Sequence, residues 1–158
     1  MFVHGSGGET RAASSFAADQ LARKGVAALA FDKRGAGAST GDWREADFHD
    51  LAGDVLACIQ VLKARRDIVG TRIGLVGAGQ AGWIAPLVAS GSRDVAFMAL
   101  ISGPAVPVWR EGWWDTEFRL RQRGFGDTAI EDARRILRLN DDVTRAGRGI
   151  EEPQTGMS

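Results

Sequence analysis

The sequence is poor in the residues that build disulfides and metal sites. Its 158 residues include one cysteine, Cys58, and two histidines, His4 and His49. A single cysteine cannot form a disulfide within the chain, and no second cysteine or histidine lies at the spacing of zinc ligands. We therefore expect no intrachain disulfide and no metal site, and we expect His49 to be a surface residue near the start of a helix.

The chain also lacks a charge imbalance and a long apolar run. Twenty basic and twenty acidic residues give a formal net charge of zero, so no overall field attracts nucleic acid or an anionic membrane. No apolar run reaches the roughly 20 residues that span a bilayer, and Met1 leads directly into a strand-like run rather than a signal peptide. We expect a cytoplasmic protein without nucleic-acid or membrane partners, unless an export signal precedes the sequence given. The oligomeric state is not indicated.

Strand-like and helix-like runs alternate over the first hundred residues. The strand-like runs are continuously apolar, which is typical of strands covered on both faces. The order β-α-β-α-β-α-β predicts parallel strands joined by right-handed crossovers. The strands are predicted at residues 1–3, 26–31, 72–76 and 95–101, and the helices between them begin near residues 10, 47 and 80.

Two of these helices carry an apolar stripe at helical spacing, which predicts one buried face each. Asp47 is the predicted N-cap of the second helix. The stripes consist of Ala13, Phe16, Ala17 and Leu21 in the first helix and of Leu51, Val55, Cys58, Ile59 and Leu62 in the second.

Beyond residue 103 the pattern changes, because prolines and tryptophans introduce two helices with no strand between them. We therefore predict a core at residues 1–103, a helical cap segment at 104–144 and a polar, flexible tail at 145–158. Three tryptophans of the cap segment either line an apolar acyl pocket or pack within the cap, and the sequence does not separate the two. They are Trp109, Trp113 and Trp114.

The most informative segment is the glycine-rich turn between the apolar run at 72–76 and the next helix. Gly77, Gly79 and Gly82 spell Gly-x-Gly-x-x-Gly, the pattern of a dinucleotide site. The same strand-turn-helix layout is that of a nucleophile elbow, Gly-x-Ser-x-Gly. A dinucleotide site also expects an acidic residue roughly 20 positions further on, where this chain has Ser102 and Gly103.

Three segments resemble the α/β-hydrolase superfamily, in its branch of serine esterases and serine aminopeptidase-like or acyl-peptidase-like hydrolases. They are residues 3–8, residues 31–41 and residues 72–89, in the order and spacing of that family. The resemblance implies a partial α/β-hydrolase fold: a short, mostly parallel sheet of about four strands, in the parent order 4-3-5-6, flanked by helices and followed by a C-terminal helical cap.

The resemblance also implies roles for the turn and the first loop. In the family a serine attacks a carbonyl, and backbone N–H groups hold the resulting oxyanion. Gly79 occupies the nucleophile position, so the serine is replaced by a residue without a side chain. The oxyanion hole maps onto His4, Gly5, Ser6, Gly7 and Gln80.

The family's catalytic histidine follows the elbow, whereas both histidines of this chain precede it. The triad region with its Asp and His is absent, and the resemblance begins only in the third strand of the family fold. We therefore expect a serine-hydrolase-like protein for esters, thioesters or peptides that is inactive alone and needs no cofactor. Four possibilities stay open: an inactive fragment, a non-catalytic module for a small acyl, ester or carboxylate ligand, a dinucleotide-binding protein, and a chain completed by a separate polypeptide.

Overall fold

The computed structural model describes residues 1–146, which fall into two compact units. The first unit comprises Met1–Ala105, and the second begins at Val106. Each unit is described by itself.

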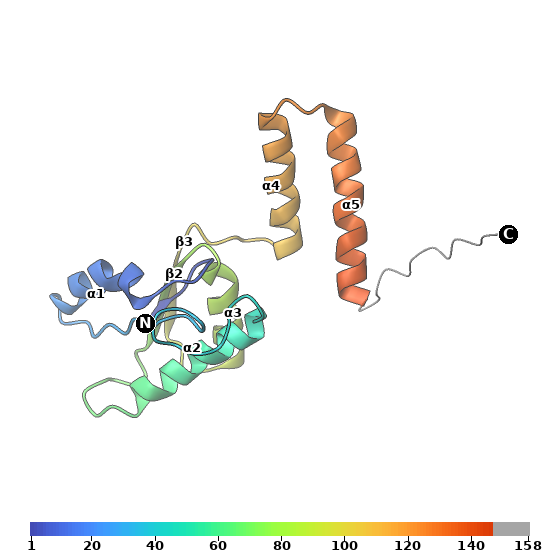
Figure 1. The fold of residues 1–158 in the computed structure, drawn as a ribbon. Helices are drawn as coiled ribbons and strands as arrows, with labels where there is room; N and C mark the ends of the chain where they lie inside the picture. The colour runs from blue at the N-terminus through green and yellow to red at the C-terminus, as the bar shows by residue number, and fades with distance from the viewer. Residues whose placement is uncertain (147–158) are drawn as a thin grey trace. The chain divides into compact units, whose positions relative to one another are not determined.

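The first unit is built on a parallel sheet of three strands in the order β1-β2-β3 (Figure 1). They are β1 (Phe2–Val3), β2 (Gly74–Ala78) and β3 (Phe97–Ile101). β2 lies in the centre and pairs with both neighbours, in a register that aligns Val76 with Phe2 and with Ala99. The prediction of parallel strands is confirmed for these three.

Helices follow the strands as the sequence predicts. They are the 3-10 helix η1 (Arg11–Ser14), α1 (Ser15–Ala22), α2 (Phe48–Lys63) and α3 (Ala81–Gly91). Asp47 is the N-cap of α2, and its carboxylate accepts a hydrogen bond from Asp50 N at 2.8 Å. The Asp50 carboxylate accepts from Asp47 N at 3.1 Å in return. This reciprocal capping satisfies two of the backbone donors that a helix start leaves open.

The apolar core lies on one face of the sheet, under α2 and α3, which pack against each other (Figure 1). Alternate strand residues such as Val3 and Leu75 point into it, as the period of two in a strand requires. The stripe predicted for α2 is confirmed, because Leu51, Val55 and Ile59 are buried and Cys58 and Leu62 pack against the core.

One predicted strand is not a regular strand. Residues 26–31 carry no strand assignment, and in the described chain one backbone hydrogen bond joins them to β1, from Phe2 N to Leu29 O at 2.9 Å. β1 is only two residues long, so it offers too few backbone groups for a second ladder, with the segment 26–31, on its other side. The sheet therefore has three strands where the sequence analysis expected about four.

Two apolar faces are exposed where the sequence predicts burial. Each residue of β3 is exposed, including Phe97 at 58 % and Ile101 at 64 %. The stripe of α1 is also not buried, and Phe16 is 79 % exposed. Apolar spacing predicts which residues share a face, but burial also requires an element to cover that face.

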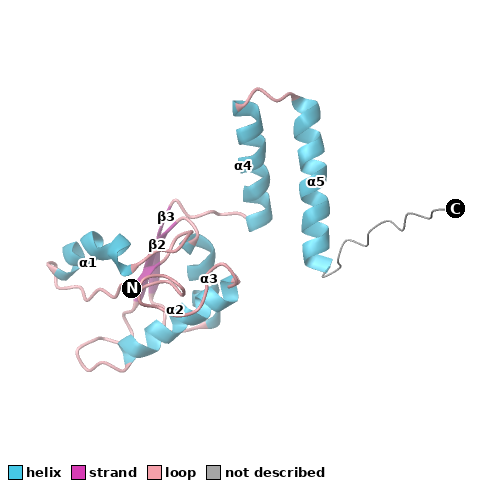
Figure 2. Ribbon diagram, viewed as in Figure 1, coloured by secondary structure: helices cyan, strands magenta, loops and turns pink. Residues whose placement is uncertain are grey.

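The second unit is a pair of helices joined by a short turn, α4 (Val108–Gln122) and α5 (Asp127–Ala146), with no strand between them (Figure 2). This matches the two helices predicted for the segment. Among residues 106–143, Ile130 alone is fully buried. α5 continues through residues 145 and 146, and the remainder of the predicted flexible tail lies outside the described residues.

Candidate functional site

The glycine turn connects β2 to α3 in a strand-turn-helix arrangement. Gly79 has φ 53°, in the left-handed region, and Gln80 is the N-cap residue of α3. The turn is closed by a hydrogen bond from Gly82 N to Gly79 O at 2.8 Å and is tied to β3 by one from Gly79 N to Ile101 O at 3.1 Å. A Cβ added at Gly79 would meet nothing within 4 Å. The turn therefore offers an open position at its tip.

The glycines on either side of Gly79 are required by the protein's own packing. A Cβ at Gly77 would collide with the Ala81 side chain and would lie 2.9 Å from Val3 O. A Cβ at Gly82 would lie 2.7 Å from the Cα of Gly103. These positions let α3 approach the strands closely, so two of the three glycines have a structural explanation that needs no ligand.

The loop after β1 begins with a buried histidine. His4 Nε2 donates to Phe31 O at 2.6 Å, and the two rings meet edge to face with centroids 4.3 Å apart. Burial is the main influence on the His4 imidazole and lowers its pKa. The side chain thus anchors the loop to the segment 26–31, and its Nε2 proton is already used in that bond.

Lys33 connects the loop to the turn, and sequence reasoning missed it. Its side chain is 2 % exposed, and its Nζ donates to Gly5 O at 2.9 Å and to Gln80 Oε1 at 2.8 Å. Glu9 fixes the other side of Gly5, because Glu9 Oε2 accepts from Gly5 N at 2.8 Å. The available signal was a lysine two residues after the apolar run 26–31, which the sequence analysis expected to be a buried strand.

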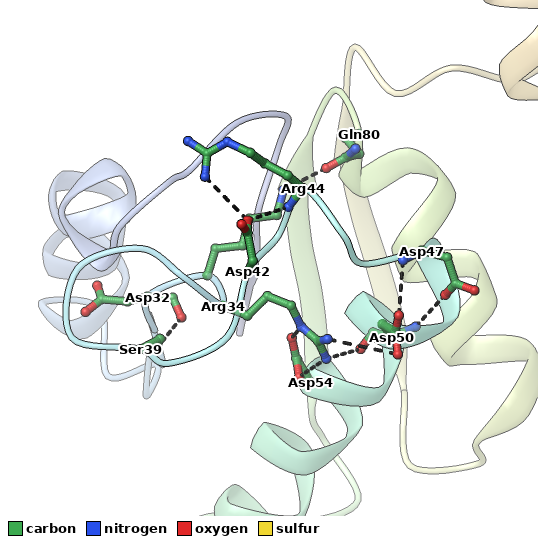
Figure 3. Close-up of polar contacts among 10 residues, drawn as sticks. Asp32, Arg34, Ser39, Asp42, Arg44, Asp47, Asp50, Asp54 and Gln80 are labelled. Atoms are coloured by element: carbon green, nitrogen blue, oxygen red, sulfur yellow. Dashed lines mark hydrogen bonds and ion pairs between the residues drawn. The ribbon is translucent and has the colours of Figure 1, made fainter.

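Asp32 and Arg34 brace the loop that follows (Figure 3). The Asp32 carboxylate accepts from the Arg11 side chain at 2.7 Å and from Ala38 N at 3.0 Å. The bond from the Arg11 guanidinium is the main reason that the pKa of Asp32 is held well below its usual range. Arg34 forms two hydrogen bonds to the carboxylate of Asp54 on α2, at 2.7 and 2.8 Å.

The family model described as "Serine aminopeptidase, S33" matches residues 1–144. The chain belongs to the serine aminopeptidase S33 family. It is therefore an α/β-hydrolase relative, and its parallel sheet with flanking helices is a partial α/β-hydrolase fold. No curated protein matches the chain.

In this serine aminopeptidase S33 relative, the predicted oxyanion residues lie on two neighbouring loops. The loop 4–8 follows β1 and Gln80 follows β2, at the carboxyl ends of two adjacent parallel strands. Lys33 bonds to both loops. The structure thus brings together the residues that the sequence analysis assigned to an oxyanion hole, whose role remains a prediction.

The three tryptophans lie on α4, in the second unit of this family member. Trp109 and Trp113 pack edge to face with ring centroids 4.7 Å apart, and the Arg138 guanidinium from α5 lies 5.4 Å from the Trp113 ring. Trp114 is 54 % exposed, with Arg110 beside its ring. Trp113 therefore contributes to the pairing of α4 with α5, and a substrate pocket at these residues stays a prediction.

A hollow of about 400 Å³ lies between the loop 31–40 and α2 of the S33 relative. It is lined by charged residues that are already paired, such as Arg34 with Asp54, and by Cys58, whose thiol has a pKa raised by burial. Neither the glycine turn nor the loop 4–8 contributes to it.

Within residues 1–146 no helix combines the length and hydropathy of a membrane span. In the same range no three His, Cys, Asp or Glu side chains are grouped to hold a metal ion.

Proposed function

We propose that the chain retains the carbonyl-binding part of a serine hydrolase site without its nucleophile, and that it binds a small acyl or carboxylate ligand without turning it over. The backbone amides of Ser6 and Gln80 are the proposed donors to the ligand oxygen. Ligands of this class are esters, thioesters, peptides and the carboxylic acids they release.

The observation that carries the proposal is the conformation of Gly79. Its φ of 53° and its open surroundings fit the strained tip of a nucleophile elbow. A glycine there relieves the strain but supplies no hydroxyl, so no acyl-enzyme can form.

The dinucleotide alternative is less well supported. A pyrophosphate site needs glycines for a tight turn and for close backbone approach to the ligand. Here Gly77 and Gly82 are explained by contacts with Ala81 and Gly103 of the same chain. We expect calorimetric titration with NAD, NADP and FAD to give no binding heat, and saturable binding of any of them would revive the alternative.

Two assays test the proposal on the chain as it stands. We expect hydrolysis of p-nitrophenyl butyrate to equal the buffer rate, and we expect butyrate to raise the melting temperature saturably. Turnover above the buffer rate would contradict the absence of catalysis. No stabilisation by butyrate or by a series of acyl esters and longer carboxylates would overturn the binding role.

A matched pair of variants locates the ligand. Gly79→Asn places a side chain at the tip of the turn, and asparagine tolerates the left-handed region. Gly124→Asn is the control, because Gly124 also has a positive φ, 82°, and open surroundings but lies in the turn between α4 and α5. We expect Gly79→Asn to abolish butyrate stabilisation and Gly124→Asn to preserve it. Equal loss in both variants, or in neither, would place the ligand elsewhere.

A further inference from the structure

Lys33 is a buried cation that joins the two loops of the proposed site. Its ammonium donates to one backbone carbonyl, Gly5 O, and to one side-chain oxygen, Gln80 Oε1. Neither acceptor carries a charge, and no carboxylate lies within ion-pair distance of Lys33 among the described residues. Burying a lysine in this way is costly unless its hydrogen bonds compensate, which makes the choice of these two acceptors informative.

The acceptor Gly5 O belongs to the same peptide unit as the Ser6 amide. A peptide unit is planar and trans, so its C=O and N–H point in opposite directions, and the described chain contains no cis peptide bond. A bond from Lys33 to Gly5 O therefore fixes the direction of Ser6 N–H, which points away from the ammonium. Glu9 holds Gly5 N at the same time, so the glycine next to this peptide unit cannot rotate freely.

The charge of Lys33 also acts on the strength of that donor. A cation at the carbonyl oxygen draws electron density through the amide and makes its N–H a stronger donor, as in other chains of polarised hydrogen bonds. The effect reaches Ser6 without any contact between Lys33 and a ligand. Ser6 itself is exposed, as a donor to a ligand must be.

We propose that Lys33 is a positioning residue, which orients and polarises the Ser6 backbone amide as a donor to the carbonyl or carboxylate oxygen of a bound acyl ligand. This inference rests on the proposed function in taking Ser6 as a ligand donor. The hydrogen bond to Gln80 Oε1 also connects Lys33 to the second loop of the site.

Several groups face Lys33 and influence its protonation. Burial is the largest influence and lowers the pKa of the ammonium, whereas the Glu9 carboxylate opposes that change. Trp43 presents its ring 5.5 Å from Lys33 Nζ. Asp32 precedes Lys33 in the chain, and His4 interacts electrostatically with Lys33. Lys33 should therefore lose its proton at a lower pH than a lysine of ordinary pKa.

The experiment is a pH titration by carbon-detected NMR, in which one peak correlates the Gly5 carbonyl carbon with the Ser6 nitrogen. That peak reports on this peptide unit and does not need the exchangeable amide proton. In the wild-type chain we expect it to shift in the alkaline range, with the same midpoint as the Lys33 Cε resonance. A peak that does not move as Lys33 titrates would overturn the proposal without any variant.

Variants separate the lysine's charge from its packing. Lys33→Met keeps the stem and removes the charge, so the titration of the Gly5–Ser6 peak should vanish. Lys33→Arg keeps a charge that does not titrate in this range, so the peak should stay at its low-pH position. Lys63→Met is the matched control, because Lys63 pairs with Asp94 on the surface, and it should leave the peak and its titration unchanged. If the Gly5–Ser6 peak still shifts with pH in Lys33→Met, another group causes the shift and the proposal is wrong.

The ligand arm measures butyrate affinity in the same variants. We expect Lys33→Met to weaken binding about tenfold, the equivalent of about 1.4 kcal/mol, and Lys33→Arg to recover most of the loss. Wild-type affinity should fall as the pH rises through the Lys33 midpoint. Equal butyrate affinity in all variants would show that Lys33 has no role in ligand binding. If butyrate does not bind at all while the peptide peak follows Lys33, the proposed ligand is wrong and the positioning of the Ser6 amide still holds.

Discussion

The glycine turn and the helical pair of the second unit are held together by opposite means. Around the turn, backbone segments approach so closely that Gly77 and Gly82 have no space for a methyl group. In the pair of helices, Ile130 is the one fully buried side chain among residues 106–143. Ion pairs that water still reaches, such as that of Arg134 with Glu117, link α4 to α5.

This difference indicates where substitutions should cost the most folding stability. Close packing is sensitive to the addition of a single carbon, whereas exposed ion pairs contribute little because water and salt screen them. The candidate site is built on the sensitive region, so its geometry is set by the core of the first unit. The helical pair should tolerate change much better.

The largest expected effect is at Gly77. Gly77→Ala should destabilise the chain by about 3 kcal/mol, because the new methyl group meets the Ala81 side chain and Val3 O. Gly79→Ala is the matched control, and it should cost roughly 1–2 kcal/mol, since the strain of a left-handed alanine is its only penalty. Urea unfolding of both variants measures the difference. Similar costs at the two positions would show that the turn is not closely packed.

A smaller effect is expected from acid at Asp32. The Arg11 guanidinium and backbone amides hold the folded-state pKa of Asp32 below the ordinary value. Its stabilising contribution is therefore complete above the ordinary pKa of about 3.9 and is lost as the pH falls toward the folded-state pKa. Asp32→Asn should be less stable than wild type at neutral pH, and the gap should narrow below about pH 4. The measurement is urea unfolding at a series of pH values, and a gap independent of pH would contradict the assignment.

The smallest effect is expected in the helical pair. Arg134→Gln removes the ion pair with the exposed Glu131 and the ion pair with the partly exposed Glu117. We expect the melting temperature and its salt dependence to change within experimental error. Ile130→Ala is the contrasting variant, because it removes the buried contact of the same unit. A larger fall in melting temperature from Arg134→Gln than from Ile130→Ala would show that ion pairs stabilise the helical pair more than its buried contact does.

Much of the first unit could be predicted from local sequence. The cap at Asp47, the buried stripe of α2 and the strand before the glycine turn depend on neighbouring residues, and the structure confirms them. The strand at 26–31 and the burial of β3 and α1 could not be predicted in this way. Pairing and burial depend on partners that are distant in the sequence, and apolar character alone does not supply them.

The candidate site likewise contains residues that could be recognised in the sequence and one whose role depends on distant contacts. The glycine pattern drew attention to Gly79, because a glycine turn between a strand and a helix is a local pattern. The resemblance to the α/β-hydrolase superfamily added Gln80 and the loop after β1. Lys33 was not identified, since its role comes from bonds to residues 28 and 47 positions away. Its neighbours Asp32 and Arg34 brace the loop that follows.

The sequence by itself determined the family, the parallel order of the strands and the glycine at position 79, because a residue type needs no structure to be read. The tertiary structure alone decided why Gly77 and Gly82 are glycines, which faces stay exposed, and that a buried lysine holds the first loop against the turn. Those properties arise where separate segments meet, and the distances between such segments are set by packing rather than by the residues of any one of them.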